Sequence, residues 1–134
     1  MKPMHELAER LLKEIADATR DTQGITRECF GAGEETALLL LANQASTLGL
    51  TAERDALQNL WIRLPDDDGT EPCTLIGSHV DSVPQGGNYD GLAGVVSGIV
   101  VLHEILRQGR KPPRPVRVLA MRAEESAWYG KAYI

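Results

Sequence analysis

The fold is decided by residues 74–121, which read TLIGSHVDSVPQGGNYDGLAGVVSGIVVLHEILRQGRKPPRPVRVLAM. The run 74–79 begins apolar and ends in small residues, and its proline and glycine neighbours favour a buried strand. A helix is expected from about Leu92 to Gln108, and residues 116–121 should form the next strand. Strand, helix and strand make a crossover unit, so we expect these two strands to be parallel.

The remaining segments complete an α/β pattern. Two helices should precede the crossover unit, followed by a pair of short strands. The expected segments are a helix over 4–19, a loop over 22–33, a helix over 34–48, two strands within 50–64 and a proline-rich linker over 111–115. Together they predict one α/β unit with a mixed sheet.

Two of the expected helices carry specific packing expectations. The first has an apolar stripe at helical spacing, made of Leu7, Leu11, Ile15 and Ala18. The helix over 92–108 contains Gly94 and Gly98, which lower its helix propensity. Such glycines are tolerable if the helix packs closely on the sheet. Gly49 suits the position just past the end of the second helix.

The bulk composition excludes several classes of protein. The 134 residues suit one domain, and the net charge of -5 argues against nucleic-acid binding, which needs a basic patch. No apolar run approaches the roughly twenty residues of a membrane span, and Glu6, Glu9 and Arg10 interrupt any signal peptide. We therefore expect a cytoplasmic protein. Cys29 and Cys73 form no CxxC pair, so a disulfide framework or cysteine-rich zinc site is not expected.

Polar side chains follow both strands of the crossover unit. His79 and Asp81 come at the end of the first strand, Asp90 closes the glycine-rich loop, and Glu124 and Glu125 follow the second strand. In open α/β sheets, ligands bind beyond the carboxyl ends of parallel strands. One imidazole and several carboxylates should therefore meet at one edge of the sheet.

This set of side chains suits divalent metal. His79 could supply a ring nitrogen while Asp81 holds the other nitrogen and fixes the tautomer. Asp90 has two carboxylate oxygens and could bridge two metals. Glu125 would bind metal, and Glu124 would act as general base on water.

Each motif taken singly has a plainer alternative. A histidine beside an aspartate is commoner on a surface than at a metal, and a pair of glutamates usually lies on a solvated face. Asp81 and Asp90 could be turn residues in a glycine-rich loop. The helical neighbours of His103 include no ligand, so we interpret it as a core or rim residue, and we interpret His5 as non-functional.

The combination of motifs is far more specific. Residues 77–84 (GSHVDSVP), 86–91 (GGNYDG) and 122–130 (RAEESAWYG) closely resemble the hydantoinase/carbamoylase group of metal-dependent, zinc-peptidase-like amidohydrolases. That group includes N-carbamoyl-L-amino-acid hydrolases and allantoate amidohydrolases. Weaker matches are 24–27 (GITR) and 55–61 (DALQNLW), where a glutamine stands at a position usually held by glycine.

The resemblance implies a role for each residue. His79 would bind the first metal, Asp90 would bridge, Glu125 would bind the second metal, Glu124 would be the base and Asp81 would orient His79. It also implies two divalent ions (zinc, manganese, cobalt or nickel) and hydrolysis of a carbon–nitrogen bond in a small N-carbamoyl or ureido substrate. The implied fold is an α/β catalytic domain interrupted by a smaller lid and dimerisation domain.

The chain departs from the group after its last motif. The group has two further histidine ligands, yet this chain has no histidine after His103. The resemblance also implies a lid domain, with a substrate-binding arginine and part of the homodimer contact, which we expect to lie outside residues 1–134. Residues 1–134 are therefore expected to be a partial catalytic domain that binds metal weakly and hydrolyses little alone. The alternatives are a non-catalytic remnant, one piece of a split enzyme, or a metallo-exopeptidase of the same clan.

Overall fold

The computed structural model describes residues 2–131. The predicted order of helices and strands is confirmed, with one short helix added after the last strand. The elements are α1 (Lys2–Ala18), α2 (Ala32–Thr47), β1 (Thr51–Arg54), β2 (Leu60–Arg63), β3 (Thr74–His79), α3 (Leu92–Arg107), β4 (Val116–Met121) and α4 (Ser126–Tyr129). No helix in this described part of the chain is both long and apolar enough to cross a membrane.

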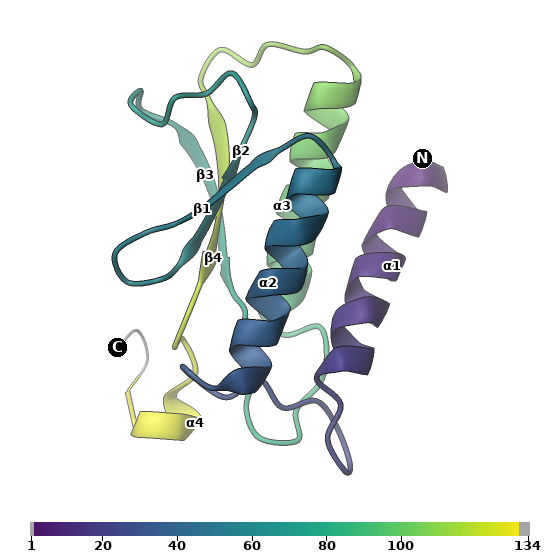
Figure 1. Cartoon of the computed structure of the whole chain (residues 1–134), viewed down its shortest axis with the longest axis vertical. Helices are drawn as coiled ribbons and strands as arrows, with labels where there is room; N and C mark the ends of the chain where they lie inside the picture. Colours follow the sequence, from purple (N-terminus) through teal and green to yellow (C-terminus); the bar gives the residue numbers. More distant parts are fainter. Residues whose placement is uncertain (1, 132–134) are drawn as a thin grey trace.

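The four strands form one mixed sheet in the order β1-β2-β4-β3. β3 pairs with β4 in parallel, from Thr74 beside Val116 to His79 beside Met121, whereas β2 runs antiparallel to β1 and to β4. The mixed sheet with a parallel crossover unit is therefore confirmed. Because β3 and β4 are parallel and in register, their carboxyl ends meet at the same edge, near the bottom of the sheet in Figure 1.

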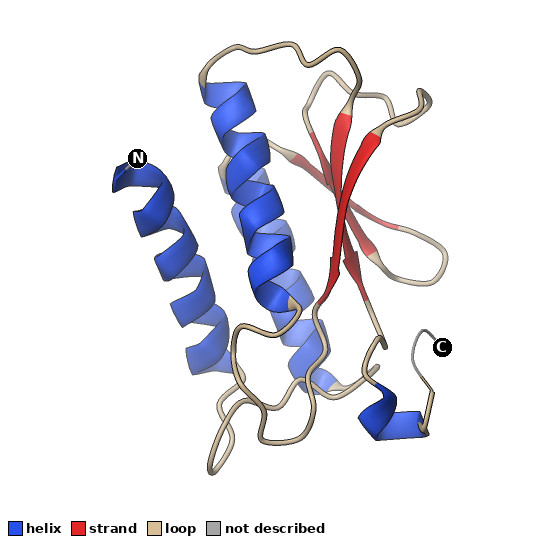
Figure 2. Cartoon of the chain, turned by 180° about the vertical axis from the view of Figure 1, so that it is seen from behind, coloured by secondary structure: helices blue, strands red, loops and turns tan. Residues whose placement is uncertain are grey.

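All three long helices cover the same face of the sheet (Figures 1 and 2). α3 packs on β3 and β4, α2 packs on β1 and β2, and α1 lies outermost against α2 and α3. The apolar core fills the space between these layers. Its fully buried members include Leu11, Ile15, Leu38, Leu41, Leu60, Ile62, Leu92, Ile99, Leu102 and Val118.

Of two expectations about the helix residues, one is confirmed and one is wrong. Gly49 follows the end of α2 with φ of +79°, as predicted for the residue after a helix. The expected place of Ala18 in the apolar stripe of α1 is wrong, since Ala18 is exposed. Thr19 is buried next to it, because its hydroxyl donates to the carbonyl oxygen of Ile15 at 2.7 Å and satisfies its polar atom locally.

Residues 74–79 form the predicted strand, but the prediction that this strand is buried is wrong. Of its residues only His79 is buried, and Leu75 has an exposed fraction of 48%. β3 lies at the edge of the sheet, and no helix of residues 2–131 covers the face opposite α3. Ile76 and Val118 point toward Gly98 of α3, so the alternating residues point to the open face.

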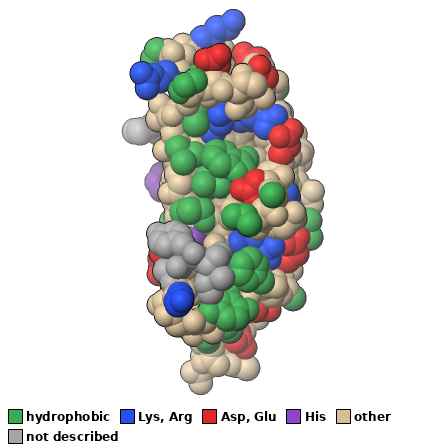
Figure 3. Space-filling model, turned by 90° about the vertical axis from the view of Figure 1, so that its left-hand side faces the viewer, with side chains coloured by type: hydrophobic (Ala, Val, Ile, Leu, Met, Phe, Trp, Pro, Cys, Tyr) green, Lys and Arg blue, Asp and Glu red, His purple; other side chains and the backbone are tan. Residues whose placement is uncertain are grey.

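Figure 3 looks onto this open face, where hydrophobic side chains gather between charged groups. The register places Leu75, Leu119 and Trp61 on that side of β3, β4 and β2. Short apolar runs do not reveal whether one or both faces of a strand are covered, which explains the error in the prediction.

The close packing of α3 on the sheet provides a stability test. A Cβ atom at Gly98 would lie 2.6 Å from Cγ2 of Val118 and 3.1 Å from Cγ2 of Ile76. We expect Gly98→Ala to lower the free energy of unfolding by about 1–3 kcal/mol through overpacking. This loss should occur although alanine is favoured over glycine in helices by about 1 kcal/mol.

Urea unfolding followed by circular dichroism measures the change. Gly77→Ala is the matched control, since a Cβ there meets nothing within 4 Å. Equal stability of the two variants would contradict the packing argument.

Candidate metal centre

His79 ends β3 with its two ring nitrogens in different surroundings. Nδ1 lies 3.0 Å from the backbone oxygen of Asp81 and 3.3 Å from its Oδ1. Nε2 lies 3.6 Å from Oδ1 of Asp90 and 3.6 Å from Oε2 of Glu124. Burial disfavours the charged ring, but hydrogen bonding to Asp81 and the charge of Glu124 outweigh it and raise the pKa of His79. Nε2 is thus the nitrogen that faces the carboxylates.

The ring of His79 packs against the backbone at the start of α3. Gly91 has φ of +66°, and a Cβ at that position would lie 2.5 Å from the imidazole. The carbonyl oxygen of Gly91 also accepts a hydrogen bond from the Ser78 hydroxyl at 2.8 Å. Glycine is therefore required here both by the positive φ and by the close approach of the ring.

The Asp81 carboxylate is fully buried and gathers several donors. Oδ1 accepts the backbone N–H of Glu124 at 3.1 Å, and Oδ2 accepts the backbone N–H of Glu125 at 2.8 Å and the Cys29 thiol at 3.0 Å. Burial opposes ionisation, but the bonds to His79, Cys29 and these two N–H groups prevail and lower the pKa of Asp81 to about 2. Burial, then Asp81, raises the pKa of Cys29, which keeps the thiol protonated as a donor.

Three side chains come close enough to share one cation. Ligand atoms of His79, Glu124 and Glu125 all lie within 4.8 Å of one another. Asp90 is not in this group, although its carboxylate lies beside Nε2 of His79. Burial raises the pKa of Glu125, and the negative charges of Asp90, Asp81 and Glu124 add to that effect against the opposing charge of His79. One imidazole nitrogen and crowded carboxylates fit a divalent cation.

A buried ion pair between Arg122 and Glu34 holds the loop that carries Glu124 and Glu125. Nε of Arg122 lies 2.6 Å from Oε2 of Glu34, whose Oε1 accepts the N–H of Ala123 at 3.1 Å. Ala123 has φ of +55°, which is uncommon for a residue with a side chain. Asn59 adds an acceptor for the N–H of Arg122 at 3.0 Å. These contacts turn the chain after β4 so that Glu124 and Glu125 reach His79.

The comparison with protein families bears directly on this cluster. Residues 59–134, more than half of the chain, match the model of peptidase family M28. The chain belongs to peptidase family M28. This segment includes the cluster and both strands of the crossover unit, so the family match covers the part of the fold that positions the site.

Relatives of this M28 chain confirm the resemblance to the hydantoinase/carbamoylase group. It is 36% identical over 124 residues to an N-carbamoyl-L-amino acid amidohydrolase of Geobacillus stearothermophilus, covering 90% of this chain and 30% of that protein. It is 29% identical over 119 residues to a ureidoglycolate hydrolase of Arabidopsis thaliana, covering 89% of this chain and 25% of the relative. A hydantoinase/carbamoylase amidase structure from Burkholderia vietnamiensis superposes with a TM-score of 0.82 at 28% identity, over 93% of this chain and 31% of that one. The chain thus spans about a quarter to a third of the length of these relatives.

The structure brings together His79, Glu124 and Glu125, with Asp81 against His79, and it places Asp90 beside Nε2 of His79 but outside the group. It also adds residues that the sequence left without a role. Glu34 resembles an ordinary acidic residue in the first turn of a helix, so only its complete burial marks it as different. Cys29 and Arg27 lie in the loop before α2, and only the resemblance of the GITR segment gave any signal there. The assignment of individual ligands and of a base stays a prediction.

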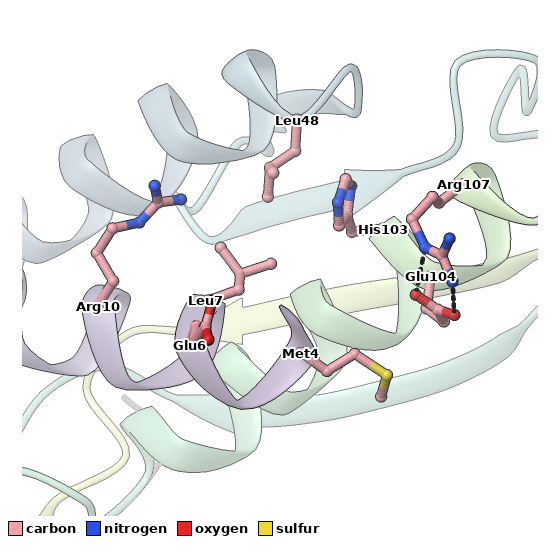
Figure 4. Close-up of a pocket in the computed structure, with 8 residues that line it drawn as sticks. All are labelled: Met4, Glu6, Leu7, Arg10, Leu48, His103, Glu104 and Arg107. Atoms are coloured by element: carbon pink, nitrogen blue, oxygen red, sulfur yellow. Dashed lines mark hydrogen bonds and ion pairs between the residues drawn. The ribbon is translucent and has the colours of Figure 1, made fainter. Parts of the chain in front are cut away.

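A separate hollow of about 410 Å³ lies at the opposite end of α3, between α1 and the end of α2 (Figure 4). His103 lines it, and its Nδ1 is buried without a hydrogen-bond partner among residues 2–131. The adjacent Glu104 pairs with Arg107. Among the described residues His103 belongs to no group of possible metal ligands, and its half-buried position agrees with its interpretation as a core or rim residue. The residues that line this hollow are Met4, Glu6, Leu7, Arg10, Leu48, His103, Glu104 and Arg107.

The buried pair of Glu34 and Arg122 predicts that substitutions of the adjacent Glu34 and Glu35 differ greatly in their effect on the free energy of unfolding. Glu34 is 0% exposed, so Glu34→Gln leaves Arg122 without its buried counter-charge. We expect a loss of about 3 kcal/mol in the free energy of unfolding. Glu35→Gln is the control, because the Glu35 side chain is 43% exposed and should cost less than about 1 kcal/mol. Chemical denaturation of both variants tests this, and similar losses would contradict it.

Proposed function

We propose that this chain carries the water-activating part of a divalent-metal-dependent amidohydrolase acting on small N-carbamoyl or ureido compounds. The observation that carries the proposal is the cluster of His79, Glu124 and Glu125 at the carboxyl ends of two parallel strands. The names of the relatives support the substrate class, since they include amidohydrolases of N-carbamoyl amino acids, ureidoglycolate and allantoate. In this proposal residues 1–134 form part of a catalytic domain.

Each residue has a defined part in the proposed centre. Nε2 of His79 and a carboxylate oxygen of Glu125 would hold cations, and Asp90, which lies beside Nε2, would be a ligand shared by both. Asp81 fixes the ring of His79 through Nδ1 and so selects Nε2 for metal. When bound, divalent cations supply Lewis acidity and lower the pKa of water.

Glu124 is the proposed general base. Its side chain is half-buried with Oε2 3.6 Å from Nε2 of His79, and its backbone is held at the site by the hydrogen bond from its N–H to Asp81. It would take a proton from water and deliver it to the departing nitrogen of the substrate. Glu125 follows directly and has the separate role of ligand in this proposal.

The chain alone should bind metal weakly. The cluster holds a single imidazole among the described residues, and each of two cations would have only two ligands from His79, Asp90 and Glu125. Catalytic zinc usually has three protein ligands. We therefore propose little or no turnover by the 134-residue chain on its own.

Metal titration tests the centre independently of catalysis. Purified chain is titrated with Zn²⁺ or Mn²⁺ by isothermal calorimetry. We expect His79→Ala and Glu125→Gln to weaken binding at least about tenfold, because each removes a ligand. His103→Ala is the matched control and should leave the affinity unchanged. Binding that is insensitive to His79→Ala would refute the ligand assignment.

Turnover assays separate the base from the ligands and one substrate class from another. N-carbamoyl amino acids, allantoate and dipeptides are supplied to the metal-loaded chain. We expect a low rate on the first two that Glu124→Gln abolishes while metal affinity is largely kept. Robust turnover would contradict the proposed weakness of the isolated chain.

The match to a peptidase family favours the alternative of a metallo-exopeptidase, which hydrolysis of dipeptides alone would support.

A further inference from the structure

The loop between α1 and α2 buries a positive charge next to the proposed centre. Arg27 has an exposed fraction of 0%. No carboxylate oxygen of the residues that the structure describes lies within 4 Å of its guanidinium, in contrast to Arg117 and Arg122, which are paired with Asp67 and Glu34. A buried charge is unfavourable unless hydrogen bonds compensate for its lost solvation, and the negative charges of Asp81 and Asp90 act on Arg27 only from beyond this distance.

The hydrogen bonds of Arg27 go to both ends of one loop. Its Nε donates to the carbonyl oxygen of Val80 at 2.6 Å, and its Nη1 donates to Oδ1 of Asn88 at 3.3 Å. Nη2 reaches the carbonyl oxygen of Asn88 at 3.5 Å, and the Arg27 backbone N–H donates to the Ser82 hydroxyl at 3.0 Å. The planar guanidinium therefore joins the chain just after β3 to the chain just before α3.

These two ends carry the residues of the proposed centre. Val80 lies between His79 and Asp81, and Asn88 lies two residues before Asp90. Asn88 is also fixed from the other side, because its Nδ2 donates to the carbonyl oxygen of Leu12 in α1 at 2.9 Å.

The carboxylate of Asp90 depends on this support. Its side chain is 75% exposed, and its distance of 3.6 Å to Nε2 of His79 is the one polar contact it makes with the described residues. The position of Asp90 is thus set by its backbone, whose carbonyl oxygen accepts the N–H of Leu92 at 2.7 Å and which follows Asn88, the residue that Arg27 contacts.

We propose that Arg27 is a positioning residue that sets the separation of His79 and Asp90. This inference rests on the metal centre of the proposed function. A role in positioning can be told from a purely electrostatic role, because the two predict opposite signs. A cationic guanidinium near a cation site repels the metal, so removing its charge alone would tighten binding. Removing a positioning contact weakens binding instead.

Arg27→Met separates these effects. Methionine is similar in length and apolar, so the fold should survive the loss of a buried unpaired charge. We expect the Kd of the full 134-residue chain for Zn²⁺, measured by competition with a chromophoric chelator, to rise about tenfold. Arg27→Lys keeps the charge but cannot donate to Val80 and Asn88 in one plane, so it should also weaken binding. Arg117→Met is the matched control: it removes a buried arginine away from the site, and it should lower stability while leaving the Kd within about twofold.

A double-mutant cycle with Asn88→Ala tests the route of the effect. If Arg27 acts through Asn88, the Kd of the double variant for Zn²⁺ should be no higher than the Kd of whichever single variant binds Zn²⁺ more weakly. Asn88→Ala also carries the test if Arg27→Met fails to fold, since it should raise the Kd by itself.

Three results would overturn the inference. They are tighter binding by a folded Arg27→Met chain, an unchanged Kd in both Arg27→Met and Asn88→Ala, and fully additive effects in the cycle. Failure of the metal centre itself has a different signature, because the wild-type chain would then bind no Zn²⁺ or bind it regardless of His79→Ala.

Discussion

The buried carboxylate of Asp81 is the contact on which the site depends. It joins three segments that are far apart in the sequence: the end of β3, the loop after β4 and the loop before α2. Two backbone N–H groups, a thiol and an imidazole converge on its two oxygens. A carboxylate with several donors remains ionised despite burial, so its negative charge is permanent at neutral pH. One group therefore contributes both to the orientation of His79 and to the course of the chain through Glu124 and Glu125.

The strand topology explains why these groups can meet on Asp81 at the edge of the sheet where β3 and β4 end. Parallel pairing of β3 and β4 requires a crossover, and α3 returns the chain so that both strands end on the same side. The glycines of α3 let this helix approach the sheet closely, and Gly91 lets the His79 ring lie against the start of the helix. Small residues thus shorten the distance between layers where the polar cluster forms.

Much of this arrangement could be predicted from particular residues. The strand–helix–strand order followed from hydrophobic patterning, and the meeting of His79 with Glu124 followed from the rule for carboxyl ends of parallel strands. The exposure of Leu75 could not be predicted, because a six-residue apolar run carries no information about which faces are covered. Nor could the burial of Glu34, since the helix-start position that it occupies is usually solvated. Its partner Arg122 lies far away in the sequence, and only the fold brings the two together.

The fully buried charges gather beside the proposed centre, whereas the buried Arg117 pairs with Asp67 near the start of β4. Arg27, Glu34 and Asp81 are each fully buried, and all three hold loops at the carboxyl ends of the strands. Between the helices and the sheet the core is instead apolar. Burying charge is unfavourable unless hydrogen bonds compensate for the lost solvation, and each bond adds a geometric constraint that apolar packing does not supply. The core therefore depends on hydrophobic packing, while the buried polar groups near the proposed centre add geometric constraints on its loops as well as stability.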